Sequence, residues 1–114
     1  MMPGVDDRTA EKIADTMFAL STPSRVLILG CLANGPRSVS ELTEQLGMEQ
    51  SAVSHQLRVL REHELVVLVE RVGRRRVYGL RDEHVASLFA SAVRHVRGDR
   101  PLRARGPAAG ARQA

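Results

Sequence analysis

The spacing of apolar positions divides the chain into a long helical part and a short part of strand character. Residues 9–20 carry apolar residues three and four apart, which predicts a helix that Thr9 caps. A second helix is expected to begin at Pro23 and to end before Asn34-Gly35-Pro36. Because this segment is apolar on nearly every side, we expect it to be the buried central helix.

Two short helices follow and are separated by a tight turn. Ser38 and Glu41 have the spacing of a capping box at the start of the first helix, and Gly47 ends it. The second helix runs from about Gln50 to about His63. Two short helices joined by a glycine-containing turn are typical of a helix-turn-helix motif.

The character of the chain changes after Leu65. The β-branched runs VVLVERVG and RRRVYGLR lie on either side of Gly73, which predicts a hairpin of two strands with a basic tip. Asp82 then caps a last helix over residues 83–97. Four helices, a hairpin and a helix form, in this order, a mainly α winged helix-turn-helix with a two-stranded β-hairpin.

The length of the chain fits one domain with a short tail at each end. The 114 residues are 43% hydrophobic and 26% charged, which is typical of a globular domain. We expect residues 1–8 to be a flexible N-terminal arm and residues 9–98 to be the winged helix-turn-helix and dimerisation domain. Residues 99–114 are rich in Pro, Gly, Arg and Ala, so a disordered basic tail is predicted there.

Charge and composition narrow the class of partner. The net charge is +4, and 16 of the 17 cationic residues are arginine, which weakly favours nucleic acid. Aromatic residues make up only 3%, so the stacking platforms of single-strand binders are missing and duplex DNA remains. Cys31 is the only cysteine, which excludes an internal disulfide and a cysteine-rich zinc finger. With no apolar run of about 20 residues and no export signal, we expect a cytoplasmic protein without a membrane partner.

The second helix of the predicted motif has one polar face without a carboxylate. Its side chains offer amide, hydroxyl, imidazole and guanidinium groups, which read base edges in the major groove. A merely solvated helix face usually mixes Glu and Lys, so the pattern favours DNA recognition. Gln56 lies on the opposite, apolar side, and the pattern does not explain it. The polar face consists of Gln50, Ser51, Ser54, His55, Arg58 and Arg61.

The predicted hairpin adds a second candidate DNA contact. Its tip carries Arg71, Arg74, Arg75 and Arg76, which suit phosphates or a minor groove. The alternative is a loop whose arginines serve only solubility. Ser38 and Ser40, at the start of the preceding short helix, complete the candidate DNA contacts.

Several segments together resemble the ArsR/SmtB family of metal-sensing repressors. The resemblance covers about residues 10–97 and rests on LSTPSRVLILGCLANGP, MEQSAVSHQLRVLREHELV, RVGRRRVYGL and DEHVASL. It implies a homodimer with the first and last helices at the interface, and an operator that is released when metal binds. It also places Gln50, Ser51, Ser54 and His55 where the family contacts DNA.

The resemblance further implies a choice of metal sites. The family's thiolate site is absent, because Ser38 and Ser40 stand where it has a Cys-x-Cys pair. The site on the last helix has the pattern Asp-x-His, ten residues, His, and two residues before a fourth ligand. Here Asp82, His84 and His95 match this pattern, but Gly98 stands at the fourth position.

The spacing of the two histidines indicates that two chains are needed. His84 and His95 are eleven residues apart, so they share a helix face but lie about 16 Å apart along the axis. Two antiparallel copies of the helix would bring Asp82 and His84 of one chain beside His95 of the other. The alternative is that Asp82 is only a helix cap and that both histidines are surface residues.

The ligand types and the resemblance favour Ni(II), with Zn(II) and Co(II) as alternatives. Water, Asp99, or a backbone or N-terminal group would complete the coordination. We therefore expect a metal-responsive repressor of an operator with an inverted repeat. The alternative is a winged-helix regulator without metal sensing, controlled by an unknown partner protein or constitutive. No nucleophile–base pair, phosphate loop or cofactor turn is visible, so no enzyme is expected.

Overall fold

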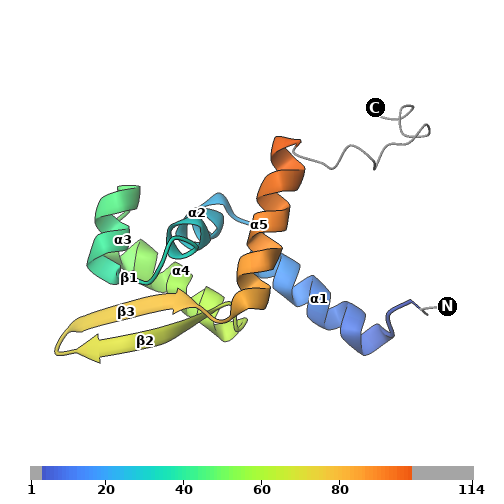
Figure 1. Ribbon diagram of the computed structural model, residues 1–114. Coiled ribbons are helices and arrows are strands. Elements are labelled where there is room, and N and C mark those ends of the chain that lie inside the picture. Colours follow the sequence, from blue (N-terminus) through green and yellow to red (C-terminus); the bar gives the residue numbers. More distant parts are fainter. Residues whose placement is uncertain (1–3, 99–114) are drawn as a thin grey trace.

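The computed structural model describes residues 4–98, which form five helices and three strands (Figure 1). The tail predicted over residues 99–114 and the first three residues of the predicted arm lie outside this range. No helix within it has both the length and the apolar character that crossing a bilayer requires. The elements are α1 (Asp7–Ala19), α2 (Pro23–Leu32), β1 (Arg37–Ser38), α3 (Val39–Leu46), α4 (Gln50–Glu62), β2 (Val66–Val72), β3 (Arg75–Leu80) and α5 (Glu83–Arg97).

The winged helix-turn-helix is confirmed, but the sheet has one strand more than predicted. The order is β1-β3-β2, and both pairs are antiparallel. In the short β1, Arg37 pairs with Tyr78 and Ser38 with Val77. Two residues are too few to show a period of two, so the pattern of apolar positions could not reveal this strand.

The start of α1 differs from the prediction. Asp6 is the N-cap, and its Oδ1 accepts a hydrogen bond from the backbone N–H of Thr9 at 2.8 Å. Thr9 is therefore not the cap, and residues 7 and 8 belong to the helix rather than to the arm. A carboxylate caps as well as a hydroxyl and adds a negative charge at the positive end of the helix dipole. The capping box predicted for Ser38 and Glu41 is confirmed, and Thr22 caps α2 by accepting a hydrogen bond from the backbone N–H of Arg25.

The core lies where α2, α3 and α4 pack together with the base of the hairpin. Its fully buried side chains include Ile28 and Leu29 of α2, Leu42 of α3 and Leu57 of α4. The expectation of a buried central helix holds for only part of α2, because Leu27 is 54% exposed. Only one side of α2 packs within the chain, and this side also buries a charged residue, Arg25.

Two helices project away from the core. Figure 1 shows α1 and α5 at one end of the molecule and the β2–β3 hairpin at the other. The only buried residues of these helices are Ala19 in α1 and Val85 in α5. Large apolar side chains remain exposed on both helices, among them Phe18 at 62% and Val96 at 81%. The described chain thus leaves two apolar helix faces uncovered.

Candidate functional site

Helix α4 turns its polar residues outward, as the pattern predicts. Val53, Leu57 and Leu60 are buried and fix the helix on the core. Gln50, Ser51, His55, Arg58 and Arg61 are exposed, and Ser54 is half-buried. A long row of donors and acceptors therefore faces solvent on a helix whose other side is rigidly held.

Two adjacent shallow hollows run along this face. The first, of about 620 Å³, begins at the N-terminal end of α4. The second, of about 420 Å³, lies between α4 and the hairpin. Together they bring six of the predicted DNA contacts into one continuous surface: Gln50, Ser51, Ser54, His55, Arg58 and Arg76.

The hairpin, or wing, closes with a two-residue turn at Gly73 and Arg74. Val72 pairs with Arg75, and Gly73 has a φ of 59°, a left-handed conformation that glycine adopts without strain. Arg71, Arg74 and Arg75 are exposed around this turn. The sequence therefore places three guanidinium groups on a narrow, stiff projection.

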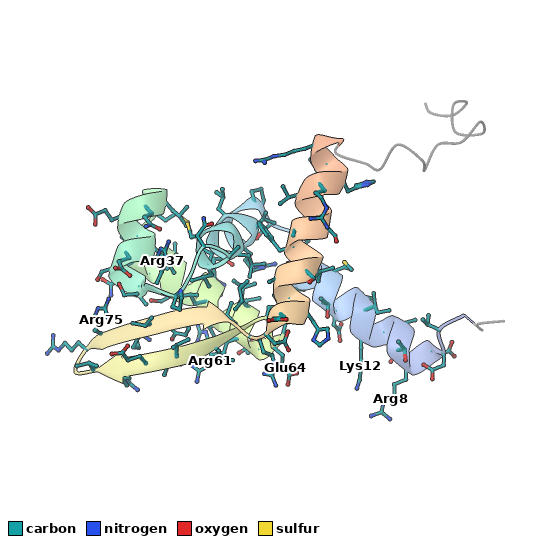
Figure 2. All side chains as sticks on the ribbon, in the orientation of Figure 1. Arg8, Lys12, Arg37, Arg61, Glu64 and Arg75 are labelled. Carbon is teal, nitrogen blue, oxygen red and sulfur yellow. The ribbon has the colours of Figure 1, made fainter. Side chains whose placement is uncertain are left out.

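One wing arginine, Arg75, forms an ion pair with α3 of the helix-turn-helix. The Nη2 atom of Arg75 lies 3.8 Å from Oε2 of Glu41, and Figure 2 shows Arg75 beside α3. The backbone N–H of Ser38, with smaller contributions from Arg75 and Arg37, lowers the pKa of Glu41 from its ordinary 4.5. Glu41 thus caps α3 and also holds the wing by a partly exposed ion pair.

The prediction that Ser38 contacts DNA is not supported by its surroundings. Ser38 is only 3% exposed, and its hydroxyl accepts a hydrogen bond from the backbone N–H of Glu41 at 3.0 Å. The capping box that the sequence indicates therefore uses the side chain. Ser40, by contrast, is exposed in the first turn of α3 and stays a candidate contact.

Arg25 is a structural residue that the sequence reasoning missed. It is 6% exposed, and its Nε and Nη2 donate to the carbonyls of Ala19 and Phe18 at 2.6 and 3.2 Å. Its Nη1 donates to Oε1 of Gln56 at 2.9 Å, which explains the polar residue on the apolar side of α4. The only signal in the sequence was one arginine within an otherwise apolar helix.

The three proposed metal ligands lie at the two ends of α5. Oδ1 of Asp82 caps the helix and accepts from the backbone N–H groups of His84 and Val85 at 2.9 and 3.1 Å. Nδ1 of His84 lies 3.7 Å from the same oxygen, and this imidazole is 98% exposed. His95 is exposed in the last turn. Asp82 therefore does cap α5, as the alternative predicted, and the imidazole of His84 stays accessible to solvent.

One chain does not assemble a metal site from these residues. No group of three or more His, Cys, Asp or Glu side chains converges anywhere within residues 4–98. Gly98 ends α5 in a left-handed conformation with a φ of 80°, so the expected fourth position is the C-cap of the helix. Asp99 lies outside the described residues. Cys31 is half-buried beside the core.

A polar recognition helix beside an arginine-rich wing defines a DNA-binding protein of the winged helix-turn-helix class. Residues 22–67 match the bacterial regulatory protein arsR family. The chain belongs to this family and is a DNA-binding transcriptional regulator, not an enzyme.

Among its relatives is the HTH-type transcriptional regulator NmtR of Mycobacterium tuberculosis H37Rv, 55% identical over 91 residues, which are 80% of this chain and 75% of NmtR. The transcriptional repressor SmtB homolog of Synechocystis is 39% identical over 87 residues, which are 76% of this chain and 65% of the relative.

Solved structures agree with this assignment. The solution structure of apo-NmtR matches with a TM-score of 0.70 and 51% identity, over 86% of this chain and 82% of that one. The homodimeric winged helix-turn-helix domain of Mb0332 from Mycobacterium bovis matches with a TM-score of 0.70 and 35% identity. That match covers 86% of this chain and 91% of the domain.

Proposed function

We propose that this protein is a homodimeric, metal-responsive repressor that acts on duplex DNA in the cytoplasm. The observation that carries the proposal is the polar face of α4, which continues without a break into the wing. Gln50, Ser54 and His55 would read base edges in the major groove, and the wing arginines would contact phosphates. The name of the Synechocystis relative, a transcriptional repressor, supports the direction of control.

The uncovered helices support a dimer. Ile13 and Met17 of α1 are 44% and 49% exposed, and Val96 of α5 is 81% exposed. Apolar side chains gathered on two projecting helices are typical of a subunit interface. A two-fold axis there would relate two copies of α4. Their operator would then be an inverted repeat with half-sites about one helical turn, or ~10 bp, apart.

The same two-fold axis would bring His84 of one protomer close to His95 of the other. Asp82 and His84 of one protomer and His95 of the other would hold one divalent metal ion, so that a dimer has two sites. All three contacts of Asp82 described above use Oδ1, which leaves Oδ2 for a metal. The metal would link the two α5 helices. The similarity to NmtR and the imidazole and carboxylate donors favour Ni(II), with Zn(II) and Co(II) as the alternatives.

Regulation requires that the metal prefer one state of the dimer. If the metal binds the DNA-incompetent state more tightly, it lowers the affinity for the operator by the same factor. A coupling of about 1–3 kcal/mol corresponds to a roughly 5- to 150-fold change.

A second candidate function is a winged-helix regulator without metal sensing. Two observations favour it: Gly98 stands at the fourth ligand position, and Asp82 already serves as the cap of α5. Such a protein would be controlled by a partner protein or would bind DNA constitutively.

The test is a titration of purified protein into a duplex that it has itself enriched from a random pool. Fluorescence anisotropy with and without Ni(II) gives the coupling, and Zn(II) and Co(II) give the metal preference. We expect a 5- to 150-fold loss of affinity with metal for the wild type and no change for His84→Ala. Ser87→Ala, one turn further along α5, is the matched control and should behave as the wild type. Equal affinity with and without each metal would favour the second candidate.

A further inference from the structure

We propose that α4 and the wing together form one phosphate-binding pocket, in which Arg61 and Arg76 hold a single phosphodiester of the DNA backbone. The proposal deepens the DNA-binding function and rests on it. It assigns a role to Arg61, which had been only part of the polar face. It also predicts that these two arginines act as a unit rather than as separate surface charges.

The pocket draws its lining from two elements that are distant in the sequence. It is the hollow of about 420 Å³ between α4 and β3. Its walls carry three guanidinium groups, an imidazole and hydroxyl groups, and the lining contains no carboxylate. Figure 2 shows Arg61 on α4 next to the hairpin. The lining residues are Ser51, Ser54, His55, Arg58, Arg61, Arg76 and Tyr78.

The arginines of this pocket have no counter-charge among residues 4–98. Among the described residues, no carboxylate lies within 4.0 Å of Arg58, Arg61 or Arg76. Arg75, the neighbour of Arg76, is different because it lies 3.8 Å from Glu41. Three like charges around one hollow repel each other, and the attraction of an oxyanion between them offsets part of that repulsion. A planar guanidinium also matches the oxygens of a phosphate by paired hydrogen bonds.

Both walls of the pocket are held by the core. Tyr78, on the β3 side, is 4% exposed and pairs with Arg37 on one neighbouring strand and Leu68 on the other. On the helix side, the buried Leu57 and Leu60 fix α4. The backbone of both walls is therefore in place before DNA arrives, and only the arginine side chains have to be ordered on binding. A phosphate held between the walls would fix the orientation of α4 and the wing on the duplex.

The test is a double-mutant cycle on a duplex that the wild-type protein enriches from a random pool. Arg61→Gln and Arg76→Gln are each expected to weaken binding about 10-fold, as the loss of one charged hydrogen-bonding partner does. Because both hold the same phosphate, the double variant should fall short of the product of the single effects by about fivefold or more. The matched control is Arg71→Gln. Arg71 pairs with Arg76 across the wing but does not line the pocket. The double variant Arg61→Gln/Arg71→Gln should weaken binding by the product of the two single effects, within about twofold.

The outcomes separate the pocket from the DNA function. If the effects multiply for Arg61 with Arg76 as well as for Arg61 with Arg71, the shared phosphate site is contradicted, and the DNA-binding function is not. Failure of the wild type to enrich any duplex would contradict the DNA function itself. If Arg76→Gln does not fold, Arg76→Lys replaces it, because lysine keeps the stem and charge but loses the paired hydrogen bonds. The same shortfall is then expected, at smaller size.

A free phosphate ion shares the chemistry of the proposed ligand, so a second experiment distinguishes the two sources. Inorganic phosphate is titrated into the DNA-free protein, and the arginine Nε–H signals are followed by NMR. We expect only weak, unsaturated shifts. Saturable binding of phosphate that the Arg61→Gln/Arg76→Gln variant abolishes, while its affinity for DNA stays unchanged, would assign the pocket to a free anion and overturn the proposal.

Discussion

Nη1 of Arg25 in α2 donates a hydrogen bond to Oε1 of Gln56 in the recognition helix α4 at 2.9 Å. The same guanidinium donates to the carbonyls of Phe18 and Ala19, which are at the C-terminal end of α1 and have no partner within that helix. One buried cation thus caps α1, at the negative end of its dipole, and also holds the DNA-reading helix.

The first prediction concerns this link. Gln56→Met leaves a buried donor of Arg25 without its partner, which should lower the free energy of unfolding by about 1.5–3 kcal/mol. Urea unfolding at fixed protein concentration measures it. Gln45→Met on the exposed face of α3 is the matched control and should change stability by no more than about 0.5 kcal/mol. Equal effects of both variants would show that the Arg25–Gln56 bond contributes nothing.

The second prediction concerns base reading by α4. Ser54→Ala and His55→Ala should each weaken binding to the enriched duplex by roughly 1–3 kcal/mol, because each removes a group that is proposed to contact base edges in the major groove. Neither side chain is part of the core, so dimerisation should be unchanged. Anisotropy measures the affinity, and sedimentation measures the dimer. Unchanged affinity in both variants would remove α4 from the recognition surface.

The third prediction concerns the wing tip. Arg74→Gln should reduce the slope of log K against log salt by about 0.9, equally on the enriched duplex and on random DNA. Arg75→Gln should reduce it by less, because the charge of Arg75 is already partly compensated by Glu41. A loss confined to the enriched duplex would mean that the wing reads bases or groove shape.

The fourth prediction concerns acid. Folding lowers the pKa of Glu41, mainly through the backbone N–H of Ser38. A lowered pKa means that Glu41 stabilises the fold above its ordinary value of 4.5 and that this contribution disappears as the pH falls through the lowered pKa. Glu41→Gln should therefore be less stable at neutral pH and should lose less stability on acidification. Parallel stability curves from neutral to acid pH would contradict this role.

The sequence predicted most of the fold because its signals are local. Helix periodicity, the capping box of Ser38 and Glu41, and the glycine turn of the wing each act within a few residues. The third strand pairs with residues far along the chain, and the hydrogen bond from Arg25 to Gln56 spans 31 residues. No local pattern contains that information.

The candidate site also has parts that the local sequence predicts and parts that depend on distant partners. The polar arc of α4 follows from helix geometry, so its residues lie together as predicted. Ser38 was expected both to cap α3 and to contact DNA, and the structure shows a buried side chain that makes the capping hydrogen bond. Arg61 and Arg76 line the same hollow because of the way the wing packs against α4, and only the structure shows this packing. The proposed metal site would need residues of a second chain, so neither the sequence pattern nor one protomer completes it.

The proposed regulation depends on a metal site that two protomers share and that controls DNA binding. It is tested most directly by mixing two inactive variants, His84→Ala and His95→Ala, and letting their subunits exchange. The heterodimer has one protomer with Asp82 and His84 and one with His95, so one of its two sites should be restored. Calorimetry with Ni(II) should then show metal binding that neither variant has alone, and the duplex should again be released by metal. No recovery in folded heterodimers with proven exchange would contradict the shared site.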